Sequence, residues 1–359
     1  MARRRRGPQV TRARNRNLLI LAVLLIGAAV VIGLVIRGHR TDDGDPNESN
    51  LAALDTNIDT QENAEPVVPN DVPETVDTPE TVETASNDVP QPVLPPTEID
   101  SEPNAPPNMR ATELIGDALI FMAADPPNLV GARDKLNEAL KLQVNAQQRL
   151  FIKEQLSSMA DKWLFSRDVY PQDKFCSTYK VQSGEQLSAI ASRYKVPYEI
   201  IMALNHISRP EALQAGQTLK LIQGPFNVRI RRSTFTLDLY LQDMFVRSFR
   251  VGLGRPGRET PTGLWCVKNR LVKPPWTDPD TGRRYEPDDE DYPLGTRWIG
   301  LTGIEGAARD RTGFAIHGTK DPQEIGAATS RGCIRMYNGD VVLVYDLLVP
   351  TDSSVRVED

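Results

Sequence analysis

The stretch 329–336, TSRGCIRM, holds the residue of this chain best suited to nucleophilic chemistry. Its cysteine, Cys333, follows Gly332 and stands between Arg331 and Arg335. A cysteine attacks as the thiolate, and a nearby positive charge or imidazole favours that form. The alternative is a small buried hydrophobe, which is the common role of a free cysteine.

The histidines favour the first interpretation. The chain has three histidines and three cysteines among 359 residues. His39 and His206 lie far from Cys333 in the sequence, so His317 is the histidine that shares its C-terminal region. An imidazole beside a thiol can accept its proton, and the sequence therefore predicts a Cys333–His317 pair. A zinc site is disfavoured, because it needs more Cys and His ligands than this region supplies.

The elements that must hold this pair are strands. Alternating apolar residues predict strands near 235–241, 244–251, 260–267, 314–319 and 354–357, with little helix between them. Residues 226–358 therefore predict a single mainly-β domain. The segment 268–297 interrupts this pattern with aromatic and acidic residues. It is compatible with a lid over the site and with a loop that packs on the domain.

The preceding segment, residues 178–222, predicts a strand, two short helices and a second strand. It resembles the LysM domain, a small α+β (βααβ) module, at Val181, Gly184, Leu187, Ile190, Ala191, Tyr194, Val196, Leu204, Asn205, Leu213, Gly216, Gln217 and Leu219. Glu185 and Gln186 stand where the family usually has Asp and Thr. The resemblance implies binding of glycans that contain N-acetylglucosamine, with Gly184, Glu185, Gln186 and Asn205 as candidate contacts.

The C-terminal region carries TPTG at 260–263, IHGT at 316–319, SRGCIRM at 330–336 and YNGDV at 337–341. Together these motifs resemble the YkuD-type L,D-transpeptidase catalytic domain over residues 226–358. Many members have His at the position of Arg331, so this chain departs from the family there. The resemblance implies a cell-wall enzyme that crosslinks peptidoglycan stem peptides without a cofactor or metal.

The same resemblance implies roles for the residues of the pair. His317 takes the proton of Cys333, and the Gly318 carbonyl holds the other imidazole nitrogen. Cys333 then forms a thioester with release of D-alanine, and the side-chain amine of a second stem resolves it. Backbone N–H groups of Arg331, Gly332 and Cys333 are the expected donors to the oxyanion.

Two further residues of this loop have alternative roles. Arg335 is compatible with binding a substrate carboxylate and with a structural ion pair. Ser330 is compatible with orienting the loop or the histidine, and with an ordinary turn.

Other functions fit the same motifs. Attack by water in place of an amine would make the protein an L,D-carboxypeptidase, and attack by a lipoprotein lysine would make it an attachment enzyme. The non-enzymatic alternative is a peptidoglycan-binding anchor protein with a degenerate catalytic domain. Intact Cys333, His317 and Gly318 count against that alternative.

The N-terminus predicts a membrane anchor. An arginine-rich tail, residues 1–17, precedes an apolar run at 18–36 that is long enough to cross a bilayer. Arginines, not a small-residue cleavage site, follow the run, which indicates an uncleaved single-pass helix. The positive tail favours an N-terminus in the cytoplasm and a catalytic domain in the periplasm or cell-wall space. The span accounts for the arginines, so no nucleic-acid partner is expected.

Residues 37–108 are rich in proline and acidic residues, and they predict a disordered, extended linker. Residues 109–170 then show apolar residues at helical spacing, with Asn128 placed to cap a second helix. This segment is loosely similar to a tetratricopeptide repeat and is compatible with docking a protein partner or with packing on the next domain. Cys176 and Cys266 are compatible with a disulfide and with free thiols.

Overall fold

The computed structural model of the chain describes residues 105–359. The predicted cytoplasmic tail (1–17), the predicted membrane span (18–36) and the predicted linker up to residue 104 lie outside the described residues. Between residues 105 and 359, no helix combines the length and the apolar character needed to cross a membrane.

The described chain begins with helices α2 (Met109–Ala123), α3 (Leu129–Leu140) and α4 (Ala146–Trp163). Asparagines Asn108, Asn128 and Asn145 cap them. The predicted cap at Asn128 is confirmed, because its side-chain oxygen accepts a hydrogen bond from the Gly131 N–H at 2.9 Å. Each helix buries one apolar face against the others, as amphipathic helices do.

These helices also contact the C-terminal domain. The Asn137 side-chain oxygen accepts the Phe245 N–H at 2.8 Å, and the Lys153 ammonium lies 2.6 Å from the buried Asp238 carboxylate. Phe245 belongs to β5 (Met244–Arg250), the last strand in the order of its sheet. A side chain from α3 thus satisfies a backbone group at a sheet edge that would otherwise need another partner.

The next module pairs β1 (Cys176–Lys180) antiparallel with β2 (Thr218–Ile222), and places α5 (Leu187–Tyr194), α6 (Tyr198–Asn205) and the short 3-10 helix η2 (Pro210–Ala212) between them. Its core is built from residues that include Leu187, Ile190, Leu204 and Leu219, all buried. The predicted βααβ order is confirmed.

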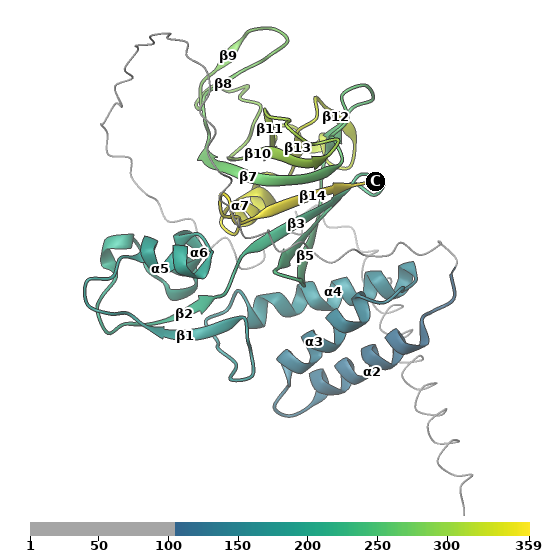
Figure 1. Cartoon of the computed structure of the whole chain (residues 1–359), viewed down its shortest axis with the longest axis vertical. Helices are drawn as coiled ribbons and strands as arrows, with labels where there is room; N and C mark the ends of the chain where they lie inside the picture. Colours follow the sequence, from purple (N-terminus) through teal and green to yellow (C-terminus); the bar gives the residue numbers. More distant parts are fainter. Residues whose placement is uncertain (1–104) are drawn as a thin grey trace, which may run out of the picture. The chain divides into compact units, whose positions relative to one another are not determined.

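The C-terminal domain is built on an eight-stranded sheet in the order β13-β11-β10-β7-β14-β3-β4-β5 (Figure 1). Its strands are β3 (Phe226–Arg231), β4 (Thr236–Leu241), β5, β7 (Gly263–Val272), β10 (Arg297–Gly306), β11 (Phe314–His317), β13 (Ile334–Arg335) and β14 (Ser354–Glu358). Smaller elements are β6 (Leu253–Gly254), paired with β12 (Ala328–Ser330), β8 (Trp276–Thr277), paired with β9 (Arg284–Tyr285), and the 3-10 helix η3 (Pro322–Glu324). The predicted mainly-β domain after an α+β module is confirmed.

Strands β3 and β10 were not predicted, and two further local features differ from the sequence expectation. Strand β7 continues to Val272, so the insertion is residues 273–296 and contains the hairpin β8–β9. Residues 338–345 form a helix, α7 (Asn338–Tyr345), that packs on β10 and β11. Its run of valine and leucine has the composition of a strand, and tertiary packing on the sheet overrides that local preference.

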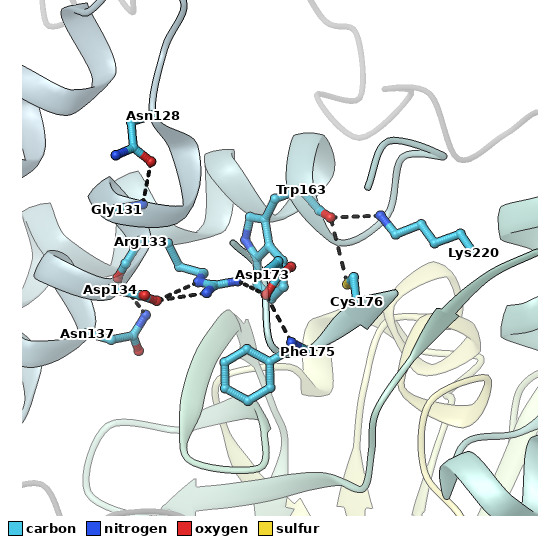
Figure 2. A network of polar contacts seen from close by, with 10 residues as sticks. All are labelled: Asn128, Gly131, Arg133, Asp134, Asn137, Trp163, Asp173, Phe175, Cys176 and Lys220. Atoms are coloured by element: carbon cyan, nitrogen blue, oxygen red, sulfur yellow. Dashed lines mark hydrogen bonds and ion pairs between the residues drawn. The ribbon is translucent and has the colours of Figure 1, made fainter. Parts of the chain in front are cut away.

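A buried charge network joins α3 and α4 to the βααβ module (Figure 2). Arg133 is 1% exposed and Asp173 is buried, and their side chains meet at 2.8 Å. The Arg133 guanidinium also lies 4.3 Å from the centre of the Trp163 ring and bonds to Asp134. A buried ion pair of this kind needs its remaining donors satisfied, and Asp134 and Trp163 provide that environment.

Lys220 of β2 extends the network. Its ammonium donates to the Trp163 and Ser166 carbonyls, at 2.7 Å each, where α4 ends. Burial lowers the pKa of Lys220, while Cys176 and Asp173 oppose that shift. The last turn of α4 is thus held by a side chain from the following module, and the two segments are structurally continuous.

Removing Arg133 should uncouple this junction. We expect Arg133→Leu to destabilise α3 and α4 by about 3–5 kcal/mol, because the Asp173 carboxylate stays buried without its cation. Hydrogen exchange across residues 129–163 measures the loss. The double variant Arg133→Leu/Asp173→Leu should recover part of it, and a double variant as unstable as the sum of the single changes would contradict this account.

Candidate active site

The pairing of β11 with β13 sets the geometry of the site. The strands are parallel, with Ile316 level with Ile334 and His317 level with Arg335. Cys333 directly precedes β13 and so lies level with Ala315. Because side chains alternate along a strand, Cys333, Arg335 and His317 project from the same face. His317 in β11 and Cys333 just before β13 thus lie on neighbouring segments of the chain, and the Cys333 thiol donates to the Gly313 carbonyl at 3.9 Å.

His317 is held on two sides. Its Nδ1 lies 2.6 Å from the Gly318 carbonyl oxygen, the contact that orients the imidazole. Trp298 of β10 pairs directly with His317 across the sheet, and the two rings stack with centroids 5.7 Å apart and planes 14° apart. Asn338 supports the following turn, accepting the Thr296 N–H at 3.2 Å and donating to the Thr319 carbonyl at 2.9 Å. The ring therefore has little freedom to turn.

Both members of the pair are neutral at rest. Burial lowers the pKa of His317 to about 4, although the Gly318 and Leu294 carbonyls oppose that shift. Burial also raises the pKa of the Cys333 thiol, against the Ala315 N–H and the Arg335 charge. Arg335 favours the thiolate and the neutral imidazole, since its charge lowers both pKa values. The geometry suits a base that receives the thiol proton as the sulfur attacks.

The loop before Cys333 is fixed by its own hydrogen bonds. The Ser330 hydroxyl donates to the Cys333 carbonyl at 2.7 Å and accepts the Gly332 N–H at 3.0 Å. These are the bonds of a turn serine, and through them Ser330 also fixes the loop. The Gly332 N–H is used within the loop, which corrects its assignment as an oxyanion donor and leaves the N–H groups of Arg331 and Cys333 as the candidates.

Thr260 holds the same loop through its side-chain hydroxyl. Its hydroxyl donates to the Gly332 carbonyl at 2.9 Å and accepts the Gly254 N–H at 3.2 Å, and the residue is 1% exposed. Gly332 itself has φ +115°, and a Cβ there would lie 2.7 Å from the Phe314 ring. A side chain at position 332 is therefore excluded by both conformation and space.

The arginines beside Cys333 are engaged in ion pairs. Arg335 pairs with Glu324, whose other oxygen accepts the Thr319 hydroxyl at 2.7 Å. Arg331 lies 3.0 Å from Asp278 and 2.8 Å from Asp280. The structural ion pair considered for Arg335 is thus present.

Sequence reasoning did not single out Thr260, Trp298 or Asn338. Thr260 lies in the TPTG motif and Asn338 in the YNGDV motif, and both motifs indicated the family without indicating a role for either residue. Trp298 could not be found from spacing, because its position opposite His317 depends on the register between β10 and β11. Among the described residues, no group of three or more His, Cys, Asp and Glu side chains could hold a metal ion, and Cys176, Cys266 and Cys333 are free thiols.

A family model for the L,D-transpeptidase catalytic domain, YkuD, matches residues 226–357. Residues 226–357 are an L,D-transpeptidase catalytic domain. A second family model, that of the LysM domain, matches residues 179–221, so a LysM domain precedes the L,D-transpeptidase domain.

Similar proteins carry the same family name. "Putative L,D-transpeptidase YkuD" of Bacillus licheniformis is 28% identical over 186 residues, which cover 50% of this chain and 97% of the relative. "Probable L,D-transpeptidase ErfK/SrfK" of Escherichia coli is 32% identical over 126 residues, covering 32% of this chain and 37% of the relative. A crystal structure of an L,D-transpeptidase from Mycobacterium tuberculosis H37Rv matches at 16% identity and a TM-score of 0.31, over 41% of this chain and 64% of that one. The match thus spans less than two thirds of that protein.

Two of the four candidate glycan contacts of the LysM domain, Asn205 and Glu185, already bond to other residues of the domain. Asn205 is 4% exposed, and its amide bonds to Ile201 and to both backbone groups of Lys220, so its role is structural. The Glu185 carboxylate accepts hydrogen bonds from the Tyr179 hydroxyl, the Arg193 guanidinium and the Gln182 N–H.

The remaining two candidates lie at the start of α5. Gly184 has φ +79° with open space around its Cα, and Gln186 is the N-cap residue without a side-chain capping bond. Both residues are exposed, and the Gln186 carbonyl accepts the Ile190 N–H at 3.2 Å within the first turn of α5.

The Thr260 contact predicts a measurable effect on residues 330–333, the segment with Cys333 that we call the nucleophile loop. We expect Thr260→Val to cost about 1–3 kcal/mol for each of the buried Gly332 C=O and Gly254 N–H groups left unpaired. Hydrogen exchange of residues 328–336 measures the loosening of the loop. Thr260→Ser keeps the hydroxyl and should stay close to wild type, whereas an equal loss in Thr260→Ser would show that the two hydroxyl bonds do not account for the loosening.

The depressed pKa of His317 predicts a pH-dependent stability. The unfolded chain binds a proton near pH 6.5, but the folded domain binds it only near pH 4. Stability should therefore fall as the pH drops from 6.5 to 4, with no contribution from this group above that window. The loss should reach about 3 kcal/mol at most.

Urea unfolding of wild type and His317→Gln across this pH range isolates the effect of the imidazole. The difference in unfolding free energy between the two proteins should change with pH only inside the window. A difference that is constant with pH would show that His317 titrates normally in the folded domain.

Proposed function

We propose that this protein forms peptidoglycan crosslinks through a Cys333 thioester, with release of D-alanine from the donor stem. The observation that carries the proposal is the placement of His317 and Cys333 on one face of neighbouring parallel strands, with the imidazole oriented by the Gly318 carbonyl. Its L,D-transpeptidase domain supports the same reaction class.

In the first half-reaction, His317 removes the Cys333 proton as the sulfur attacks the carbonyl carbon before the terminal D-alanine. The oxyanion that forms is met by backbone N–H groups of Arg331 and Cys333, each worth on the order of 3 kcal/mol in comparable sites. The C–N bond then breaks, and His317 returns its proton to the leaving amine. A buried imidazole of low pKa releases that proton readily.

In the second half-reaction, the side-chain amine of a neighbouring stem attacks the thioester. His317 accepts a proton from this amine, the C–S bond breaks, and the proton returns to the Cys333 sulfur. The product is a crosslink between third-position residues of two stems. Water in the place of the amine would release a shortened stem, and a lipoprotein lysine would give an attached lipoprotein.

The modules before the catalytic domain support work at the cell wall. We propose that the LysM domain binds peptidoglycan strands through their N-acetylglucosamine units. The apolar run 18–36 would anchor the chain in the cytoplasmic membrane with its N-terminus inside, and the acidic linker would let the domains reach the wall. Two attachment points raise the concentration of the enzyme near its substrate.

Mass spectrometry of the intact protein tests the catalytic proposal. After mixing with a disaccharide-tetrapeptide, we expect an adduct on Cys333 equal to the donor minus D-alanine, together with crosslinked dimers. Cys333→Ala should give neither, because it lacks the nucleophile.

Products in the same reaction separate the alternatives. An adduct with only shortened peptide would indicate an L,D-carboxypeptidase. The complete absence of adduct and product from wild type would contradict the proposal and favour the wall-anchor protein.

A further inference from the structure

The insertion 273–296 reaches both members of the catalytic pair. At its C-terminal end, the Gly295 backbone packs directly against Gly318, and the Leu294 carbonyl influences the pKa of His317. At its other end, the hairpin β8–β9, residues 276–285, extends to the loop that carries Cys333. The insertion therefore runs from the histidine side of the site to the cysteine side.

Ion pairs fix the tip of this hairpin to the nucleophile loop. Arg331, two residues before Cys333, contacts Asp278 through Nη1 at 3.0 Å and Asp280 through Nε at 2.8 Å. Arg258 contacts the same Asp280 carboxylate at 3.1 Å. Arg331, Arg258, Asp278 and Asp280 form the cluster that we call the latch.

The acidic side of the latch is preformed. Asp278 is 8% exposed, and its Oδ1 accepts the N–H groups of Asp280 at 2.8 Å and Thr281 at 3.3 Å. These bonds and the Arg331 guanidinium hold the pKa of Asp278 below its ordinary value, although burial opposes that shift. The carboxylates are thus built to meet an arginine and are not loosely placed surface charges.

The latch attaches the hairpin β8–β9, which is otherwise mostly exposed, to the rest of the domain. Within residues 105–359, the polar contacts that link the hairpin to parts of the domain outside the insertion are those with Arg331 and Arg258. The hairpin's other ion pairs, Arg283 with Asp291 and Arg284 with Glu286, stay inside the insertion. Opening the latch would therefore release the hairpin from the nucleophile loop.

We propose that Arg331 is a positioning residue whose latch holds the hairpin β8–β9 over the Cys333 thioester and favours its attack by an amine over attack by water. The inference rests on the proposed function. In either outcome the C–S bond breaks and the proton returns to sulfur through His317, but the new bond is C–N in the crosslink and C–O in the hydrolysed stem. A closed hairpin limits water, whereas the acceptor amine arrives on a bound stem.

The chemistry of the latch suits repeated opening. A guanidinium bonds two carboxylates at once in a fixed plane, which a lysine ammonium does not reproduce. The Arg331 and Asp280 side chains are 33% and 35% exposed, so their attraction is moderate and screened by salt. The hairpin can thus leave the loop to admit a donor and return after acylation.

The test removes the acidic side of the latch and leaves the nucleophile loop intact. Asp278→Asn/Asp280→Asn is compared with wild type and with Glu286→Gln, which loses an acid of the same insertion outside the latch. Each protein is given a disaccharide-tetrapeptide at low and high salt. Acylation rate and the ratio of hydrolysed stem to dimer are read by mass spectrometry, and hydrogen exchange is read across residues 276–285.

In the double variant we expect faster hydrogen exchange of the hairpin and an acylation rate close to wild type. The ratio of hydrolysed stem to dimer should rise about fivefold, which is the size of effect that loss of several exposed ion pairs allows. High salt should move wild type toward the variant and leave the variant unchanged. Glu286→Gln should behave as wild type. Arg331→Lys should reproduce part of the shift in the product ratio, because it keeps the charge without the two-pronged contact.

Either of two results would overturn the latch in an enzyme that acylates. Hairpin exchange that does not respond to the double substitution would show that these ion pairs do not hold the hairpin. Faster exchange with an unchanged product ratio would show that the hairpin does not select the acceptor. Absence of any thioester in wild type would instead overturn the proposed function, and the choice between acceptors with it.

Discussion

The site depends on the parallel pairing of a very short strand, β13, with β11. Only Ile334 and Arg335 are in this strand, so the pairing needs support from outside it. That support comes from Gly252, which exchanges backbone hydrogen bonds with Arg335 at 2.9 Å each way, and from the Met336 N–H donated to the His317 carbonyl at 2.9 Å. A shift of the register by one residue would turn Cys333 to the opposite face from His317.

Burial gives this pair its chemical character. Removing the imidazole and the thiol from water disfavours the charged form of each, so the resting site holds a neutral acid and a neutral base. The Trp298 ring stacked on the imidazole favours protonated His317, because an aromatic face attracts a cation. The nearby Arg335 charge disfavours protonated His317. The net result is a depressed pKa, so a protonated His317 would give up its proton readily.

The modules before the catalytic domain are joined to it by structure and not only by sequence. The Arg133–Asp173 pair and Lys220 link the helices to the LysM domain, and Asn137 and Lys153 link the same helices to β5 and β4. Of the two roles open for the helical segment, the structure shows packing on its neighbours. The last residues of the predicted linker also take part, because the Asn145 amide bonds to the Ala105 carbonyl and Asn108 caps α2.

The sequence by itself determined the order of modules, several of the strands and the identity of the rare residues Cys333 and His317, because these depend on local periodicity and composition. Only the tertiary structure decided which polar groups are already bonded to other residues of the protein. Gly332 donates to Ser330, Asn205 is buried against β2, and Arg331 pairs with Asp278 in a hairpin much earlier in the chain. Contacts between segments distant in sequence depend on register and packing, and no local pattern encodes them.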